Sequence, residues 1–583
     1  MQTLDYLILF SYFILSFLIA FLFLKRSGRN IDEFFLAGRK LPWYLAGLSL
    51  VATTFAADTP IAVTELVTKN GISGNWIWWN FAFGGMLTVF FFARLWRRAG
   101  IMTEAEFAEL RYSGKSASFL RGFRAVYLGL FMNVIIIGWI NKAMMMILTG
   151  MFGIEESVVI YYVFGCMVFV AIYSAISGLW GVVLTDAFQF FIAMTGSIIL
   201  AIFVLNTDQI NGLDGLRSNL PDFIFNFFPN ISSDIGSYGS AFSLTILSFL
   251  AYVGIQWWAS WYPGAEPGGG GYTAQRMMSA KNEKHSLLAT FFFQIAHYAI
   301  RPWPWIIVGL ATLILYPDLS FDQKGLGYIY SMRDFLPVGF KGLLVAAFFA
   351  AYMSTIATHL NWGSSYLVND LYRRFIAEGK TEKHYVGISR MVTLGLMVVS
   401  IIASLYISRV SLAWEFILQC GAGLGLVLIM RWYWWRINAW SEISAMIAPF
   451  IVYYILQYTS IEFPESLYIL VSVTTVVWLI VTFATKPVDE NKLIEFYKKV
   501  YPGGKLWKKI SERIPGFEVQ ASFGKMFLNW LLGVALVYSC LFGLGSFLFK
   551  GFAESIIYVI IALLSLSLIF LNISRGNYFS SPK

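Results

Sequence analysis

Apolar residues in this chain fall into blocks of about twenty, separated by short polar stretches. A helix crosses the hydrocarbon core of a bilayer in ~20 residues, so blocks of this length match membrane-spanning helices. Strands of a transmembrane barrel would instead show alternating segments of about ten residues. Because backbone amides in lipid must be satisfied within the fold, the sequence predicts an all-α, polytopic membrane protein of about fifteen transmembrane helices.

Composition supports this class. The chain is 58% hydrophobic and 13% charged, whereas soluble domains are about a quarter charged. The formal net charge of +9 comes from Lys and Arg between the apolar blocks, as in cytoplasmic loops, so we expect no nucleic-acid partner. Cys166, Cys420 and Cys540 lie in apolar blocks without paired spacing, which is typical of buried thiols.

Loop charges predict the orientation. We expect helices near 4–24, 42–68, 74–96, 123–151, 157–177, 180–206, 240–263, 286–316, 339–368, 385–406, 411–434, 440–458, 465–484, 526–549 and 552–573. Loops after odd-numbered segments are basic, and those after even-numbered segments are weakly charged or acidic. The positive-inside rule therefore predicts a multi-pass cell-membrane protein with its N-terminus outside and its C-terminus inside.

Two of these segments are poor helices at their centres. One contains Asp58 and Pro60, and the other runs from Gln256 through Pro263 into the glycines of 268–271. The breaks fall at matching positions in two five-segment halves, a pattern that indicates an inverted-repeat secondary transporter. The alternative is that both are ordinary proline kinks, which membrane helices tolerate.

Motifs for enzyme chemistry are scarce. Gly114-Lys115-Ser116 resembles the end of a phosphate-binding loop, but residues 101–113 lack the required glycine. The four histidines have no carboxylate or cysteine at a metal-binding spacing. We therefore expect no enzyme, and either coupling to an ion gradient or passive transport.

Several intramembrane polar residues are candidates for function. The hydroxyls of Ser354 and Thr355 either bond within their helix or offer oxygens to a monovalent cation. Asp186 is a functional candidate because carboxylates in lipid are costly, although its position also permits helix capping. Arg301 can bind a solute carboxylate, or neutralise Asp58 or Glu415 as a structural pair. The histidines at 297 and 359 are expected to be packed and hydrogen-bonded.

Several stretches of the chain resemble the sodium/solute symporter family over residues of about 33–440. These stretches are Phe35–Arg39 with Leu41-Pro42-Trp43, Gly47–Ala52, Trp180–Gln189, Gln275-Arg276 and Ala346–Tyr372. The resemblance implies a five-plus-five inverted-repeat core with discontinuous helices. It also implies sodium-coupled symport of a small polar organic solute, such as a sugar, polyol, amino acid or organic acid, by alternating access.

The resemblance also implies a division of the chain. We expect an N-terminal extra helix (1–32), a first inverted repeat (33–206), an extracytoplasmic loop (207–239), a second inverted repeat (240–434), additional helices (435–484), a basic cytoplasmic linker (485–525) and C-terminal helices (526–583). The partners expected are sodium as the coupling ion, a small-molecule solute and the lipid bilayer, with a monomeric functional unit.

Site residues follow from the same resemblance. The family's sodium site would use the carbonyls of Ala52, Phe55 and Ala351 with the hydroxyls of Ser354 and Thr355, and Asp186 matches a family aspartate associated with sodium coupling. The expected solute contacts are Thr54, Asp58, Thr59, Trp79, Asn80, Gln256, Trp257, Tyr298, Arg301, Glu415 and Gln419. The pattern departs from that of the sugar carriers, because Asn80 replaces an acidic contact and a His-Tyr pair replaces a lysine.

Two other functions stay open at this point. Proton coupling through Asp186 or Asp58 would make transport follow pH and ignore sodium. A transporter-like sensory protein would need a cytoplasmic output domain, and the stretch 485–525 is too short to be one.

Overall fold

The fold was taken from a computed structural model, which describes all residues except 230–245, 408–409, 518–521, 576–578 and 580–583. Its α-helices are α1 Thr3–Ser27, α2 Ile31–Leu36, α3 Trp43–Thr53, α4 Thr59–Asn70, α5 Trp76–Trp79, α6 Phe81–Leu87, α7 Ala93–Ala99, α8 Phe107–Arg111, α9 Gly114–Val126, α10 Asn133–Phe152, α11 Glu156–Leu205, α12 Gly212–Asn219, α13 Ile246–Leu250, α14 Trp257–Ala259, α15 Gly271–Ser279, α16 Glu283–Ile295, α17 Trp303–Leu315, α18 Leu326–Phe335, α19 Phe340–Ser365, α20 Glu382–Ser404, α21 Val410–Cys420, α22 Leu424–Tyr433, α23 Ala439–Leu456, α24 Glu465–Ala484, α25 Glu490–Val500, α26 Lys508–Ser511, α27 Phe523–Phe549 and α28 Phe552–Arg575. Short π-helical turns, η3 Thr88–Phe92, η4 Tyr127–Met132, η7 Ala251–Gln256, η8 Ala296–Ile300 and η10 Tyr366–Ile376, continue several of them.

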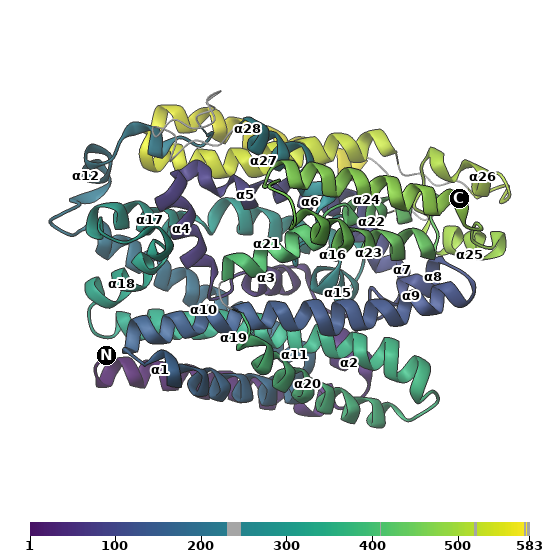
Figure 1. The fold of residues 1–583 in the computed structure, drawn as a ribbon, viewed down its shortest axis with the longest axis horizontal. Helices are drawn as coiled ribbons and strands as arrows, with labels where there is room; N and C mark the ends of the chain where they lie inside the picture. The colour runs from purple at the N-terminus through teal and green to yellow at the C-terminus, as the bar shows by residue number, and fades with distance from the viewer. Residues whose placement is uncertain (230–245, 408–409, 518–521, 576–578, 580–583) are drawn as a thin grey trace.

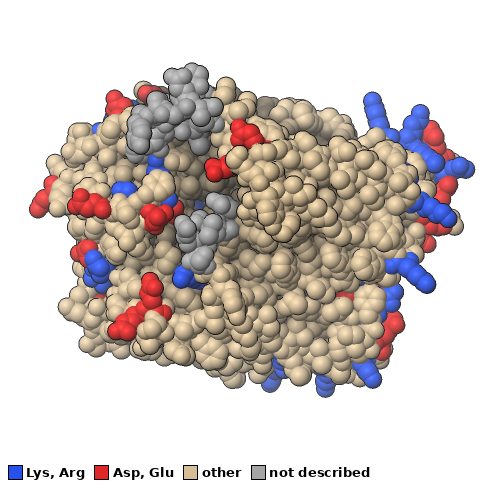
Figure 2. Space-filling model, viewed as in Figure 1, with Lys and Arg blue, Asp and Glu red and all other residues tan. Residues whose placement is uncertain are grey.

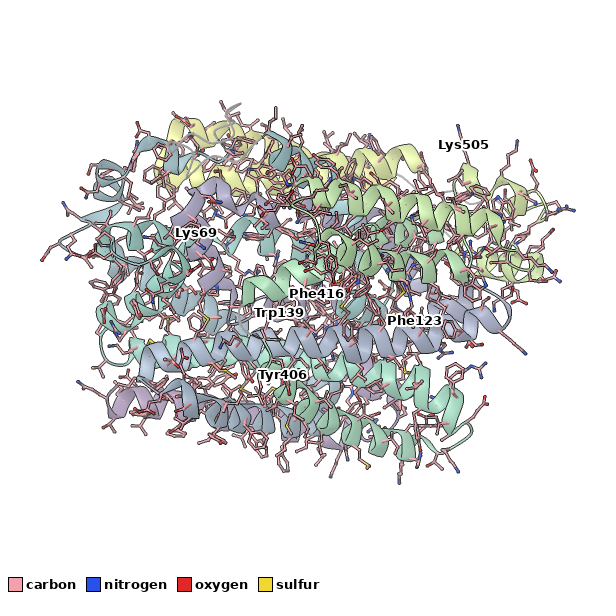
Figure 3. All side chains as sticks on the ribbon, viewed as in Figure 1. Lys69, Phe123, Trp139, Tyr406, Phe416 and Lys505 are labelled. Atoms are coloured by element: carbon pink, nitrogen blue, oxygen red, sulfur yellow. The ribbon has the colours of Figure 1, made fainter. Side chains whose placement is uncertain are left out.

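The helices lie roughly along the long axis of the molecule (Figure 1). Outer helices such as α1, α24 and α28 expose large apolar side chains, including Phe10, Ile480 and Leu563. On the face shown in Figure 2, charged side chains gather at the two ends of the long axis and leave an uncharged band between them. Lys69 and Lys505 lie toward opposite ends (Figure 3). This is the surface of a multi-pass membrane protein, because an exposed apolar band matches lipid tails.

The expected segments overlap these helices, although some are divided, and residues 240–245 of the segment expected at 240–263 lie outside the described residues. Within the described residues, eleven helices are long and apolar enough to cross a membrane, and three shorter apolar helices are Trp43–Thr53, Ile246–Ala259 and Leu424–Tyr433. One of the eleven, α11, has 50 residues and would be ~75 Å long if straight, far more than the ~30 Å hydrocarbon core.

Helix α11 consists of two arms that reverse direction at Gly178, where φ is 57° and ψ is −163°. Just before this glycine, the carbonyl of Ile176 accepts a hydrogen bond of 2.6 Å from Ser27 at the end of α1. Beyond it, Gln189 donates to the hydroxyl of Tyr12, back toward the middle of α1, at 2.6 Å. The two arms are therefore the separate segments expected near 157–177 and 180–206.

Both predicted helix breaks are confirmed. The first separates α3 from α4, with Asp58 at the N-cap position of α4 and Pro60 within its first turn, where a missing amide donor costs little. The second separates α14 from α15 and contains Gly264, Gly268 and Gly269 at positive φ.

A third break was not expected. The segment predicted as one helix over 411–434 is divided into α21 and α22 at Gly421–Gly423. Its backbone pairs with the second break, since Trp261 donates to the Gly421 carbonyl at 3.0 Å and Gly423 donates to the Ala259 carbonyl at 2.9 Å. Each break thus satisfies polar groups that the other exposes, which makes irregular backbone tolerable at membrane depth. A Cβ at position 421 would lie 2.5 Å from the Trp261 carbonyl oxygen, so the close approach requires glycine.

Helix α19 lies at the centre of the bundle and is almost entirely buried. It packs against both α11 and α1, while α3 packs on α16 and α11. The C-terminal helices α27 and α28 form a hairpin on the outside that contacts α6 and η8. The first break and the second arm of α11 are therefore held against one face of α19.

Candidate functional site

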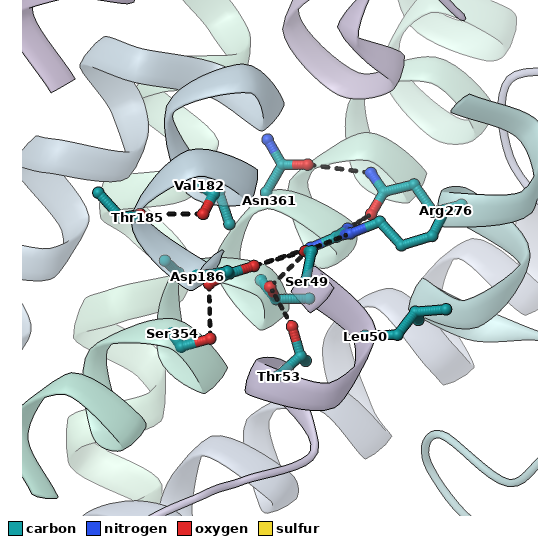
Figure 4. A network of polar contacts seen from close by, with 12 residues as sticks. Ser49, Leu50, Thr53, Val182, Thr185, Asp186, Arg276, Ser354 and Asn361 are labelled. Carbon is teal, nitrogen blue, oxygen red and sulfur yellow. Dashed lines mark hydrogen bonds and ion pairs between the residues drawn. The ribbon is translucent and has the colours of Figure 1, made fainter. Parts of the chain in front are cut away.

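Asp186 is the centre of a buried polar network in the second arm of α11 (Figure 4). Its Oδ2 accepts a hydrogen bond of 2.5 Å from Ser49 of α3, and its Oδ1 accepts one of 2.6 Å from Ser354 of α19. The carboxylate thus joins three helices and does not act as a helix cap, the alternative that the sequence left open. Each hydroxyl oxygen keeps a lone pair that can also face a cation.

The same network contains a buried positive charge, the guanidinium group of Arg276. Arg276 of α15 lies with Nη2 3.8 Å from Oδ2 of Asp186. Its Nε donates to the Ser49 hydroxyl at 3.0 Å, and Nη2 donates to the Thr358 hydroxyl at 2.9 Å (Figure 4). A buried carboxylate needs such compensation. Any ion that binds Asp186 must therefore share its charge with Arg276.

A second group of oxygens lies where α3 ends against α19. The Thr355 hydroxyl donates to the carbonyl of Thr53 at 2.9 Å and to that of Ala351 at 3.1 Å. The carbonyl of Ala52 accepts tight-turn bonds from the amides of Thr54 and Phe55, the latter at 3.0 Å, as the helix unwinds. Carbonyls of an unwound helix and neighbouring hydroxyls are the ligands that sodium takes in inverted-repeat transporters. The donor set therefore suits a hard monovalent cation.

Beside the first break, Thr54 at the end of α3 meets His297 of η8 and Arg301 at the end of η8. The Thr54 hydroxyl lies 3.0 Å from Nδ1 of His297. Arg301 donates from Nη1 to the Val51 carbonyl at 2.9 Å and to the Thr54 hydroxyl at 3.2 Å. Arg301 is buried and makes no ion pair with a carboxylate of the described residues, although the charge of Asp58 attracts it from farther away. Glu415, the other partner that the sequence left open, has its side chain outside the described residues. The Nε of Arg301 has no hydrogen-bond partner within the described residues and so keeps capacity for a further acceptor.

Helix α5 and the second broken helix meet in the same region. Asn80 donates to the carbonyl of Ile77 at 2.9 Å, and Gln256 donates to the same carbonyl at 3.1 Å. The Oδ1 of Asn80 is buried without a hydrogen-bond partner in the described part of the chain. Tyr298 stacks on Trp78 with ring centroids 5.7 Å apart. Trp78 and Tyr298 both contact the ring of His297, with centroids 5.7 and 4.3 Å away, and so form an aromatic wall beside Thr54.

Other expected solute residues lie elsewhere. The ring of Trp79 packs on Phe542, and that of Trp257 packs on Trp530, both on the outer helix α27. The indole of Trp257 donates to a carbonyl of its own helix. These two tryptophans are therefore held by the periphery of the bundle and not brought to the Thr54 cluster.

The remaining expected residues are placed as follows. Asp58 is buried at the N-cap of α4, and Thr59 begins that helix. Gln419 lies near the end of α21 and is half-buried. The side chain of Glu415 is outside the described residues. His359 is packed and hydrogen-bonded, as expected, with Nδ1 2.6 Å from the amide oxygen of Asn133.

Sequence reasoning missed the network partners Ser49, Arg276 and Thr358 as site residues. Ser49 and Arg276 lie in stretches that carry the family resemblance, which was the available signal. It also missed Glu266 in the second break, where the neighbouring glycines indicated only an interrupted helix.

The chain was compared with known proteins. A family model described as the sodium:solute symporter family matches residues 34–448. A sodium/glucose cotransporter of Vibrio parahaemolyticus is 23% identical over 487 residues, covering 80% of this chain and 87% of that relative. A sodium/sialic acid symporter of Proteus mirabilis is 23% identical over 420 residues, covering 69% and 78%. A solved structure of a sodium-coupled sialic acid symporter, substrate-bound and outward-open, has a TM-score of 0.67 at 20% identity and covers 84% of this chain and 99% of its own.

Proposed function

This chain belongs to the sodium:solute symporter family, and on that premise we propose how its residues couple sodium to a small polar organic solute. Members of this family are transporters and not enzymes. The observation that carries the assignment is the pair of oxygen clusters on α19, one at Asp186 and one at the unwound end of α3. Both clusters offer oxygen ligands of the kind that sodium prefers, and the Asp186 cluster also contains the Arg276 guanidinium.

The first proposed sodium site consists of the carbonyls of Ala52, Phe55 and Ala351 with the hydroxyls of Ser354 and Thr355. It is supported by the position of Thr355, which bridges the end of α3 and the Ala351 carbonyl. Sodium there would replace these hydrogen bonds and tie α19 to the broken helix. Binding would thus stabilise one arrangement of the two bundles, as alternating access requires.

Asp186 is proposed as a second ion-coupling residue. Ser354 contacts Asp186 and neighbours Thr355, so the two ion sites would share one turn of α19. Moving one positive charge inward through 100 mV releases about 2.3 kcal/mol, which is the energy available for concentrating the solute.

The solute site is proposed at the first break, formed by Thr54, Tyr298 and Arg301, with Asn80 and Gln256 beside them. It is supported by the free hydrogen-bonding capacity of Arg301 Nε and Asn80 Oδ1, both buried and without a partner within the described residues. Asp58, Thr59 and Gln419 extend this proposal along α4 and α21. The repeats 33–206 and 240–434 would then rock around the site.

The proposed orientation has the N-terminus outside and the C-terminus inside a cell membrane. It is supported by the distribution of charge, since the N-terminus lies at the same end as α12, and the basic α25 and α26 lie at the other (Figure 1). Cationic side chains dominate the latter end in Figure 2. Under the positive-inside rule that end faces the cytoplasm. The functional unit is proposed to be a monomer in the bilayer.

Ligand-dependent thermal stability tests the sodium assignment. A ligand that binds only the folded state adds about 2.7 kcal/mol at a hundredfold excess over Kd. We expect sodium, but not potassium, to raise the Tm of the detergent-purified protein, and Ser354→Ala with Thr355→Ala to abolish that rise. Ser365→Ala is the matched control, because Ser365 is also buried on α19 but bonds only within its own helix.

The competing outcome is equally clear. Equal stabilisation of the wild type and the double variant by sodium would show that neither the Ser354 nor the Thr355 hydroxyl is a sodium ligand. A protein whose solute uptake into proteoliposomes follows pH and ignores sodium would instead be proton-coupled through Asp186 or Asp58.

A further inference from the structure

Glu266 lies inside the second break, between α14 and α15, and is only 3% exposed. Neither of its carboxylate oxygens has a hydrogen-bond or ion-pair partner among the residues that the structure describes. The backbone amides of Gly264 and of Glu266 itself lie near the carboxylate and interact with it, but they carry no net charge. An ionised carboxylate buried in this way is costly unless a positive charge reaches it.

The neighbouring ionic cluster does not supply that charge. Arg124 contacts Glu104 at 3.2 Å and Glu442 at 2.8 Å, and Arg431 contacts the same two carboxylates at 3.0 and 3.5 Å. Two arginines and two glutamates therefore pair with one another, and the buried Arg111, which interacts with Glu442, donates to the carbonyls of Arg431, Trp434 and Trp435. Glu104 also accepts a 2.8 Å hydrogen bond from the Gly271 amide. Glu266 is a third carboxylate beside this cluster, and no cationic side chain of the described residues forms an ion pair with it.

The glycine run brings the backbone up to both carboxylates. A Cβ at Gly270 would lie 2.9 Å from Oε2 of Glu104, and a Cβ at Gly271 would lie 2.6 Å from Oε1 of Glu266. The second position would also be 3.4 Å from the ring of Trp362. The break is thus shaped around a buried carboxylate with an aromatic ring at its side.

Tyr272 connects this carboxylate to the proposed solute site. Its hydroxyl lies 2.1 Å from the point that a Cβ of Gly264 would occupy, and the methyl group of Thr54 lies 3.2 Å from the same point. Thr54 in turn binds Arg301 at 3.2 Å. The ring of Tyr272 also packs edge-on to Trp362 at 6.4 Å. Glu266, which has aromatic neighbours, and Arg301, whose Nε has no hydrogen-bond partner within the described residues, therefore both lie near Tyr272.

A carboxylate beside aromatic rings is the chemistry that recognises an organic ammonium group, through charge and cation–π attraction. We propose that Glu266 binds the cationic nitrogen of the transported solute, so that the pocket selects a zwitterion whose carboxylate is held by Arg301. This inference rests on the proposed function, because it deepens the solute site and leaves the sodium sites unchanged. In this proposal Glu104, Arg124, Arg431 and Glu442 stabilise the second break, and the Glu266 carboxylate is the group that contacts the solute cation.

The test compares Glu266→Gln with Glu104→Gln in the full-length purified protein. Because Glu266 has no side-chain partner among the described residues, Glu266→Gln should leave the Tm without solute unchanged or slightly higher. Glu104→Gln leaves Arg124 and Arg431 undercompensated and should lower the Tm, which makes it the control for a merely structural carboxylate. Glu266→Asp keeps the charge and checks that any effect is electrostatic.

The probes are zwitterions and their singly charged analogues, added in sodium. Glycine betaine, γ-aminobutyrate and proline are each paired with an analogue that lacks the cationic nitrogen and with one that lacks the carboxylate. We expect at least one zwitterion to stabilise wild type and to bind at least tenfold more weakly to Glu266→Gln. Arg301→Gln should weaken the same zwitterion and the analogue that lacks the nitrogen.

Two results overturn the inference. One is an identical response of wild type and Glu266→Gln to every probe, including no response at all, while sodium still stabilises both. The other is a loss of sodium stabilisation in Glu266→Gln, which would make Glu266 an ion ligand. If sodium stabilises neither protein, the sodium assignment itself has failed, and that failure is distinguishable from the other two.

Discussion

Replacement of Asp186 separates its two roles, as the counter-ion of Arg276 and as the proposed sodium ligand. Asp186→Asn leaves the Arg276 guanidinium, 3.8 Å from Oδ2, without a compensating charge in a fully buried position. At that separation, with an effective dielectric constant of ~20, the lost attraction is about 4 kcal/mol. This agrees with the ~3–5 kcal/mol cost of breaking a buried ion pair by removing one partner.

The double variant Asp186→Asn with Arg276→Gln removes both charges together. We expect it to recover most of the lost Tm, because no uncompensated charge remains and both amides can bond to Ser49 and Thr358. If Asp186 is also a sodium ligand, the recovered protein should still bind sodium at least tenfold more weakly than wild type. Sodium-dependent Tm and sodium-dependent uptake into proteoliposomes measure the two properties separately.

The refuting result is specific. A double variant that regains both stability and wild-type sodium dependence would show that Asp186 serves only to neutralise Arg276. A double variant no more stable than Asp186→Asn would show that the ion pair is not the source of the lost stability.

Two further predictions concern the breaks and the loop between α7 and α9. Gly421→Ala should lower both the Tm and solute uptake, because the new Cβ would lie 2.5 Å from a carbonyl oxygen of the second break. Gly395→Ala is the control and should lower neither, because no atom lies within 4 Å of its new Cβ. Equal effects of the two substitutions would contradict the close approach at Gly421. Burial alone would raise the pKa of Glu109, but hydrogen bonds led by that from Arg374 lower it to about 2 from its ordinary 4.5. A depressed carboxylate pKa adds stability that is present above the ordinary value and lost as pH falls through the folded value. Glu109→Gln should therefore lower the Tm near pH 7 and flatten its decline between pH 4.5 and about 2, and an unchanged acid profile in differential scanning fluorimetry would contradict this.

Sequence determined the class of this protein, an all-α membrane protein. Backbone amides in lipid must form hydrogen bonds within their own segment, so an apolar block long enough to cross the bilayer indicates a helix. The two breaks were predictable for the same local reason, since Pro60 and the glycines near 268 weaken helices wherever they occur. The third break was not, because Gly421 and Gly423 read as tolerable helix residues until the facing backbone of Trp261 is known.

Tertiary structure decided what each polar residue contacts. Ser49, Asp186 and Ser354 are separated by more than a hundred positions, yet two hydrogen bonds join them. Apolar length fixes neither the rotation nor the tilt of a membrane helix, because those depend on packing against its neighbours. For that reason the sequence could rank Asp186 as functional but could not reveal its pairing with Arg276, nor that Glu266 is left without a partner in the described structure.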